Sequence, residues 1–285
     1  MSTTRTVELE GVSLFVASLG GGKPVFVLGG PWFGQYYLRE FNEALAKHFR
    51  VIAYDPRGSG RSSPLTQAEI SLAGHLHDLE ALRQSLGVEK LNLVGHSMGA
   101  HVAILYAADH PEQMASLVLM HPAPPFAEHL QEQMQNAFVA RFTPDDQTRM
   151  KQISSSSPFR SGDPAAHEDY FRVLYSPFFR DRSLLAQVNF AFTSTTAMYA
   201  VRAEGHLLPS ILSMDPASRL GEIQSPTLIV HAQHDIIPEE FSRSLAEGIP
   251  HARFVLLEGL GHFAYLEDPS RAMPPVIEFL RQHAG

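Results

Sequence analysis

Residues 91–100 read LNLVGHSMGA and combine three signals in one short stretch. The apolar residues at its start predict a short buried strand, and those after Met98 predict a helix over residues 98–110. Residues 95–99 lie between the two and form the pattern G-x-S-x-G. On a strand-to-helix turn this pattern exposes the serine hydroxyl above the sheet, at the positive end of a helix. The stretch therefore predicts that Ser97 is a nucleophile.

The two glycines beside Ser97 belong to the same prediction. A serine on so sharp a turn has a strained backbone. Gly95 and Gly99 lack the Cβ atoms that would crowd the neighbouring strand and helix. Glycine and serine are common residues, so it is the strand before the pattern and the helix after it that make the pattern specific.

Short apolar strands alternate with amphipathic helices on both sides of this stretch. The other expected strands are 6–10, 13–17, 24–28, 51–54, 117–120, 227–230 and 253–257, and the other expected helices are 37–49, 72–86, 239–246 and 274–283. Alternation of this kind implies βαβ units with right-handed crossovers. The predicted fold class is α/β, with a mostly parallel central sheet flanked by helices.

The alternation stops between residues 122 and 216. This stretch contains prolines, a run of four serines at 154–157 and many aromatic residues. A flexible linker would be poorer in aromatic side chains. We therefore expect a mostly helical cap over residues 122–216, inserted into a core formed by residues 1–121 and 217–285.

A serine hydroxyl needs a base within hydrogen-bond reach, and that base needs a group to orient it. In sheets of this type such groups lie in loops at the carboxyl ends of strands. Asp235 follows the strand 227–230, and His262 follows the strand 253–257 between two glycines. The order Ser97, Asp235, His262 is the one expected when the serine stands on a nucleophile elbow. In that arrangement His262 relays the proton and Asp235 orients it.

Other roles remain open for some of these groups. Asp235 could instead cap the helix that follows it, and Glu258 is the nearest competing acid. Two clusters could in principle bind a metal: one is His75, His77 and Asp78, and the other is His231, His234 and Asp235. His75 and His77 are two apart on a helix and point to different sides, and no second cluster completes a set of ligands, so we expect no metal. Acyl transfer through a serine needs no cofactor, and none is expected.

Two backbone amides are expected to bind the oxyanion of an acyl intermediate. One is the N–H of Met98, next to the nucleophile. The other comes from the loop GGPWFG at residues 29–34, where Gly30 is the first choice and Trp32 the second, since proline has no N–H. The glycine-rich run at 55–62, DPRGSGRS, has no lysine in the position of a phosphate-binding loop. It is interpreted as scaffold below the site.

Composition narrows the class of protein. The net charge is −8 and no basic cluster occurs, which argues against nucleic acids and membranes as partners. The absence of cysteine excludes disulfides, thiolate metal sites and a cysteine nucleophile. No apolar leader or membrane-length run is present, so a cytoplasmic protein is expected. The expected partner is a small-molecule or short-peptide substrate, and the sequence has no signal for an oligomeric state.

These motifs together resemble the α/β-hydrolase family over nearly the whole chain. Within it, GGPWFG followed by YDPRGSGRSS is similar to the proline iminopeptidase-related group of serine peptidases, which usually carries HGGPG and a DQRGSGRS-like run. That group has an Arg-x-Glu-x-His segment in its cap, and residues 202–206, RAEGH, are similar to it. The resemblance implies that Glu204 pairs with the substrate's ammonium group, with Glu168 as a candidate second acid.

The sequence departs from that group at several positions. Leu28 stands where the usual histidine would be, Trp32 replaces a glycine, and the elbow is GHSMGA where the peptidases usually have GGSWG. Elbows like GHSMGG are typical of esterases, lactonases and C–C hydrolases. The resemblance favours a serine hydrolase that acts as a proline iminopeptidase-like aminopeptidase on small substrates. The alternative is an esterase or lactonase for small apolar esters, and a third hypothesis is a binding protein that keeps the fold without hydrolysis. In the first two, the cap aromatics enclose an apolar group and Trp32 lines the entrance.

Overall fold

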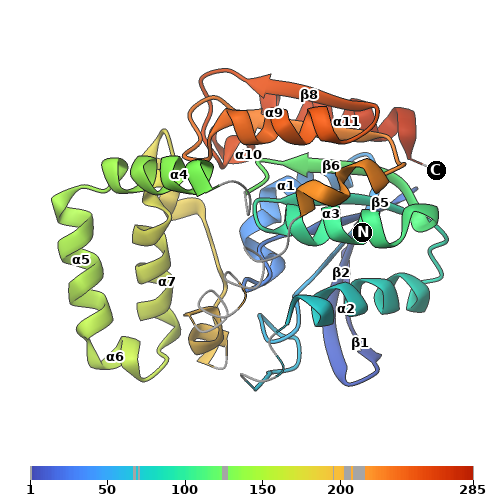
Figure 1. The fold of residues 1–285 in the computed structure, drawn as a ribbon. Coiled ribbons are helices and arrows are strands. Elements are labelled where there is room, and N and C mark those ends of the chain that lie inside the picture. The colour runs from blue at the N-terminus through green and yellow to red at the C-terminus, as the bar shows by residue number, and fades with distance from the viewer. Residues whose placement is uncertain are drawn as a thin grey trace.

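The computed structural model describes residues 2–66, 69, 71–123, 128–194, 196–201, 207 and 216–284. In this part of the chain a single sheet has the strand order β1-β2-β4-β3-β5-β6-β7-β8 (Figure 1). The strands are β1 Ser2–Leu9, β2 Val12–Gly20, β3 Pro24–Leu28, β4 Arg50–Tyr54, β5 Leu91–His96, β6 Met114–Met120, β7 Thr227–Ala232 and β8 Ala252–Leu257. The predicted strands are all present, and the N-terminal pair is longer than predicted.

Strand direction follows from the connections. β1 and β2 form an antiparallel hairpin, and β2 pairs antiparallel with β4. Every later neighbour pair, from β3–β4 to β7–β8, is parallel. The prediction of a mostly parallel sheet is confirmed. All residues of β5 and β7 are buried, as expected for central strands covered on both faces.

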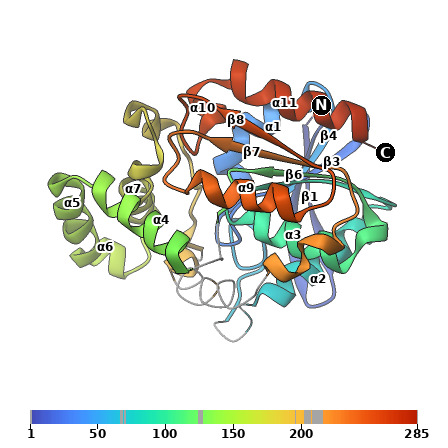
Figure 2. The same cartoon turned by 45° about the horizontal axis from the view of Figure 1, so that its top comes forward.

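Helices cover both faces of the sheet, which lies between them in Figure 2. The helices α1 Arg39–Ala46 and α11 Pro269–His283 pack on one face, and α2 Leu72–Ser85, α3 Gly99–Asp109 and α9 Glu239–Gly248 pack on the other. This arrangement brings the carboxyl ends of the parallel strands, and the loops that follow them, to one edge of the sheet. The candidate functional residues lie in those loops.

Two helices differ from the prediction at their ends. The helix expected at 37–49 begins with a 3₁₀ turn, Gln35–Leu38, before α1. The terminal helix begins at Pro269, and Pro274 and Pro275 lie inside it. Its start is set by Asp268, whose side chain accepts a hydrogen bond from the Arg271 amide, and by proline in the first turn. The short helix α10 Ala264–Glu267 was not predicted.

The described part of the segment between β6 and β7 is mostly helical. It contains α4 Glu128–Arg141, α5 Pro144–Ser155, α6 Ser157–Arg160, α7 Pro164–Leu174 and the 3₁₀ turns Ser176–Phe178, Arg182–Gln187 and Pro216–Glu222. Figure 1 shows α5, α6 and α7 standing to one side of the sheet, with α4 leading back toward the strand ends. Within residues 128–194 the chain forms no strand.

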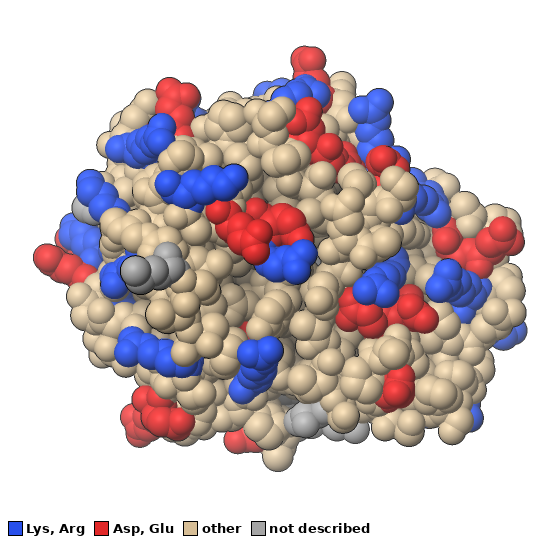
Figure 3. All heavy atoms as spheres, turned by 180° about the vertical axis from the view of Figure 1, so that it is seen from behind, with Lys and Arg blue, Asp and Glu red and all other residues tan. Residues whose placement is uncertain are grey.

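The described helices include none long and apolar enough to cross a lipid bilayer. The face drawn in Figure 3 has acidic and basic side chains interspersed over a largely uncharged surface. Charges of opposite sign at such short spacing cancel at a distance, so this face has no extended field of one sign.

Candidate active site

Ser97 sits on a strained turn between β5 and α3. Its φ is +55°, in the left-handed region that side chains other than glycine rarely adopt. A Cβ at Gly95 would lie 2.7 Å from the Ala100 Cα, and a Cβ at Gly99 would lie 2.5 Å from the backbone oxygens of Leu28 and Gly29. The strained backbone and the need for glycine on both sides of the serine are therefore confirmed.

His262 and Asp235 form a buried pair. The Nδ1 of His262 lies 2.7 Å from Oδ2 of Asp235, and Oδ1 of Asp235 accepts the Ile237 amide at 3.1 Å. Burial acts to raise the pKa of Asp235, but the charge and hydrogen bond of His262 outweigh it, so the pKa lies below its ordinary value. Asp235 is thus held as a carboxylate. Glu258, the competing acid, is exposed.

Ser97 and His262 line one small pocket. Its other lining residues are Gly30, Trp32, Phe33, Tyr37, His96, Met98, Tyr175, Phe190 and Phe263. The free space is about 10 Å³, which is room for about one water molecule. Between the described side chains of Ser97 and His262 there is no hydrogen bond; contacts of this kind often tighten only when substrate is bound.

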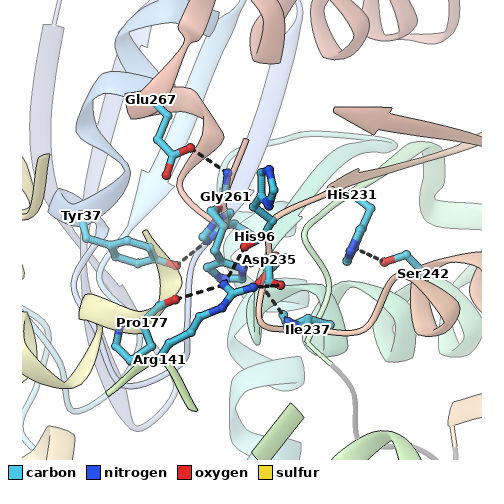
Figure 4. A network of polar contacts seen from close by, with 12 residues as sticks. Tyr37, His96, Arg141, Pro177, His231, Asp235, Ile237, Ser242, Gly261 and Glu267 are labelled. Atoms are coloured by element: carbon cyan, nitrogen blue, oxygen red, sulfur yellow. Dashed lines mark hydrogen bonds and ion pairs between the residues drawn. The ribbon is translucent and has the colours of Figure 1, made fainter. Parts of the chain in front are cut away.

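A series of polar contacts links Tyr37 and His96, which line the same pocket as Ser97 (Figure 4). The Gly30 amide donates to the Tyr37 hydroxyl at 2.8 Å, and that hydroxyl lies 3.3 Å from Nδ1 of His96. Nε2 of His96 lies 3.3 Å from the backbone oxygen of His262. A carbonyl can only accept, so Nε2 of His96 carries the proton and Nδ1 accepts from Tyr37. Burial holds the pKa of His96 well below its ordinary value, which keeps the ring neutral.

These hydrogen bonds alter the expected use of the Gly30 amide, which in this structure donates to the hydroxyl of Tyr37. Sequence reasoning missed Tyr37 as a member of the site, because its spacing fits an ordinary helix face. Its ring lies directly under the loop: a Cβ at Gly29 would be 2.6 Å from the Tyr37 hydroxyl.

Arg141, at the end of α4, binds the loop that holds the acid (Figure 4). Its guanidinium donates to the backbone oxygens of His234 at 2.6 Å and Asp235 at 3.0 Å, and to that of Pro177 at 3.3 Å. The segment between β6 and β7, called the insertion from here on, thereby fixes the backbone at Asp235. Nothing near Arg141 in the sequence marks it for this role.

Glu267 joins the inserted segment to the loop of His262. Its carboxylate accepts the amide of Gly261 at 2.7 Å and the amide of Arg180 at 2.8 Å. The His262 amide itself donates to the Phe178 oxygen at 3.1 Å. The segment between β6 and β7 therefore binds the His262 amide directly, through Phe178, and reaches the Gly261 amide through Glu267. The sequence did not predict this arrangement.

Aromatic side chains close the pocket. The ring of Phe33 lies between 4.8 and 6.2 Å from the rings of four insertion residues, Phe171, Tyr175, Phe190 and Phe192. Trp32, expected at the entrance, is only 3% exposed and lines the pocket itself. Its indole Nε1–H has no hydrogen-bond partner in the described part of the chain. The pocket is therefore lined by aromatic rings beside Ser97 and His262, and one lining side chain, Trp32, has a buried donor without a partner among the described residues.

The sequence also named Glu204 and Glu168 as candidate substrate-binding acids. Glu204 falls outside the described residues. Glu168 forms an ion pair with Arg172 at 3.1 Å and accepts the Phe190 amide at 3.0 Å. Burial raises the pKa of Glu168. It lines a hollow beside Arg39, and it is not among the residues around Ser97.

The candidate metal clusters have other partners. Asp78 binds the Arg57 guanidinium through both oxygens, at 2.5 and 2.6 Å. His231 lies 2.9 Å from the Ser242 hydroxyl through Nδ1. Across the described residues no three histidine or acidic side chains meet in a group that could hold a metal ion.

The loop at residues 55–62 is scaffold in this structure. The Asp55 carboxylate accepts the amides of Gln35 at 2.8 Å and Arg61 at 2.9 Å, and it is buried. It holds the loop after β3 against the loop after β4.

Comparison with known proteins agrees with this architecture. Residues 24–269 match the family described as "alpha/beta hydrolase fold". A proline iminopeptidase of Heyndrickxia coagulans is 26% identical over 267 residues, covering 92% of this chain and 91% of that protein. A 2-hydroxy-6-oxo-6-phenylhexa-2,4-dienoate hydrolase of Comamonas testosteroni is 27% identical over 272 residues, covering 92% and 89%. The crystal structure of the enol-lactonase from Burkholderia xenovorans LB400 has a TM-score of 0.72 at 21% identity, covering 97% of this chain and all of that one.

Proposed function

Since the chain belongs to the α/β-hydrolase fold family, we propose that it is a serine hydrolase that cleaves acyl bonds through an acyl-enzyme. Ser97 is the proposed nucleophile, His262 the general base and Asp235 the residue that orients it. The observation that carries the proposal is the buried 2.7 Å contact between His262 and Asp235 beside the strained turn of Ser97. No cofactor is required.

In the proposed reaction Nδ1 of His262 stays bound to Asp235, so Nε2 is the atom that takes the Ser97 proton. Ser97 Oγ then bonds to the acyl carbon, and the imidazolium beside Asp235 is stabilised by the carboxylate. The Met98 amide and a second donor from the loop after β3 bind the oxyanion. His262 returns its proton to the leaving group, and a water activated by the same ring releases the acid.

The pocket favours a small, uncharged apolar acyl group, and we propose esters or lactones as the substrate class. Its described lining residues include aromatic rings and no carboxylate. An ammonium group buried there would lose its hydration without gaining an acidic partner from those residues, which is unfavourable. A neutral ester carries no such cost.

An aminopeptidase is the second candidate. It is favoured by the similarity to a proline iminopeptidase and by the RAEGH segment with Glu204. In this version Glu204 is the amino anchor, and the substrate is an amide with a free N-terminal amine.

A fluorophosphonate probe tests the proposed chemistry. We expect folded wild-type protein to be labelled at Ser97 and Ser97→Ala to remain unlabelled, with peptide mapping to locate the adduct. Wild-type protein that resists the probe and hydrolyses neither substrate class would support the third hypothesis, a binding protein without hydrolysis.

A paired assay separates the two substrate classes. We expect p-nitrophenyl butyrate to be hydrolysed and proline p-nitroanilide to be left intact. Turnover of the anilide that is lost in Glu204→Ala, while ester hydrolysis is spared, would instead establish the aminopeptidase. Equal loss on both substrates would remove the amino-anchor role of Glu204.

A further inference from the structure

The hydroxyl of Tyr37 contacts the Gly30 amide, which was the first choice of oxyanion donor from the loop after β3. Tyr37 lines the same pocket as Ser97 and Met98. Its oxygen accepts the Gly30 amide at 2.8 Å, an ordinary hydrogen-bond length. An amide has a single proton, so in this arrangement the Gly30 N–H is directed at the phenol.

The position of the phenol is tightly determined. Its ring packs beneath Gly29, where a Cβ would come within 2.5 Å of the ring and 2.6 Å of the oxygen. The backbone oxygen of Tyr37 also accepts the Tyr265 hydroxyl at 2.6 Å. Tyr37 is 4% exposed, so water has little access to the hydroxyl. Moving the phenol away from Gly30 would require the loop and the turn Gln35–Leu38 to shift together.

The proton of the phenol is weakly engaged. Its acceptor among the described residues is Nδ1 of His96 at 3.3 Å, which is long for a hydroxyl donor. Burial raises the pKa of Tyr37 above its ordinary value, against the Gly30 hydrogen bond, so the hydroxyl keeps its proton. A negatively charged oxygen in the pocket would be a far stronger acceptor than neutral His96, because charge-assisted hydrogen bonds are shorter and stronger.

We propose that the Tyr37 hydroxyl is the second oxyanion donor and that the Gly30 amide acts through it, by binding and polarising the phenol. This inference rests on the proposed serine hydrolase function and names a further catalytic residue for it. In the resting enzyme the O–H points to His96, and as the oxyanion forms the O–H rotates toward the charge. The proton stays on the phenol throughout, and no other bond changes.

The variant Tyr37→Phe decides between the two donors because they predict opposite outcomes. If the phenol binds the oxyanion, kcat for p-nitrophenyl butyrate falls by about 10²- to 10³-fold with KM little changed. If the Gly30 amide is the donor, removing the phenol oxygen frees that amide, and kcat stays the same or rises. The second result would overturn the proposal.

Tyr106→Phe is the matched control. Tyr106 is also a buried tyrosine with a short hydrogen bond, to Glu80 at 2.5 Å, but it lies on α3 outside the pocket. We expect it to lower the melting temperature and to leave kcat near the wild-type value. A similar fall of kcat in both variants would assign the effect to stability and overturn the catalytic role.

The wild-type crystal structure after fluorophosphonate labelling gives a second measurement that does not depend on the folding of a variant. We expect the phosphonyl oxygen to lie within hydrogen-bond distance of the Met98 amide and the Tyr37 hydroxyl. An adduct whose oxygen contacts the Gly30 amide would contradict the role of Tyr37 alone. A wild-type protein that neither labels nor hydrolyses ester would overturn the proposed function together with this inference.

Discussion

The loops at the carboxyl ends of the core strands differ from the segment between β6 and β7 in what they bring to the pocket. The core loops supply Ser97, Asp235 and His262, each next to the strand that positions it. The inserted segment supplies rings such as Phe190, and polar contacts such as those of Arg141 and the Phe178 oxygen, which bind backbone atoms of the core loops. The groups proposed to react therefore come from the core loops, and the segment between β6 and β7 adds rings and backbone contacts around them.

This division has a physical cause. A catalytic side chain must be placed to within a fraction of an ångström, which a loop anchored to a buried strand achieves. The insertion packs mainly through aromatic rings, whose contacts are individually weak and less directional. Its few directional bonds converge on the loops of Asp235 and His262. The insertion can therefore determine the size of the substrate and support the pair without supplying a reacting group.

The largest expected effect tests the claim that the chemistry belongs to the core loops. In Asp235→Asn the amide can no longer stabilise an imidazolium and favours the wrong tautomer of His262, so kcat for ester hydrolysis should fall on the order of 10⁴-fold. The control is Glu258→Gln, which changes the exposed acid after β8 and should leave kcat unchanged. A loss below about tenfold in Asp235→Asn would remove Asp235 from the relay.

The pH dependence of the free energy of unfolding tests the burial of three histidines. Burial lowers the pKa of His75, His101 and His121 from 6.5 to about 3. Between these values the unfolded chain binds more protons than the folded one, so the free energy of unfolding falls as the pH falls from about 6.5 toward 3. Each histidine contributes about 1.4 kcal/mol per pH unit.

Chemical denaturation at several pH values measures this slope. The variant His121→Asn should reduce it by the contribution of one histidine, and asparagine tolerates the positive φ of 47° at this position. A slope that is the same in wild type and variant would show that His121 titrates normally in the folded protein.

The next effect concerns Glu267, which links the loop of His262 to the segment between β6 and β7. Glu267→Ala removes the acceptor of the Gly261 and Arg180 amides, and hydrogen bonds to a charged group contribute about 1.5 to 3 kcal/mol each. We expect the free energy of unfolding to fall by about 3 kcal/mol and kcat to fall about tenfold, because the loop of His262 loses one of its links to the insertion and keeps the bond to the Phe178 oxygen.

Glu267→Gln is the conservative partner of that variant. Its remaining carbonyl oxygen accepts one of the two amides, so it should recover part of both losses. The role of Glu267 in positioning His262 would be refuted by a Glu267→Ala enzyme that is destabilised yet keeps the wild-type kcat.

The smallest effect is on selectivity. Trp32→Phe removes the uncommitted Nε1–H from the pocket and retains an aromatic ring. p-Nitrophenyl methoxyacetate carries an ether oxygen where the butyrate has a methylene. One hydrogen bond is worth about 1 kcal/mol. The kcat/KM for the methoxyacetate divided by that for the butyrate should therefore fall about fivefold in the variant. An unchanged ratio would mean that the indole N–H forms no hydrogen bond with the acyl group.

Part of this site was predictable from the sequence because its signals are local. The elbow, the acid and the histidine each follow an apolar run within a few residues, and parallel strands place their carboxyl ends at one edge. The predicted start of the terminal helix was wrong. The sequence analysis placed it at Pro274, whereas the helix begins at Pro269 after the capping residue Asp268.

The sequence by itself determined the fold class, the strained turn of Ser97 and the order of the three proposed catalytic residues, since all of these depend on short-range patterns. Tertiary structure alone decided that Asp235 meets His262, that the Gly30 amide binds Tyr37, and that Arg141 and Glu267 hold the loops. Several contacts around the site join residues far apart in the chain: Tyr37 and His96 are 59 residues apart, Arg180 and Glu267 are 87 apart, and Arg141 and Asp235 are 94 apart. Such pairs are set by how helices and loops pack against the sheet, and side-chain periodicity carries no record of that packing.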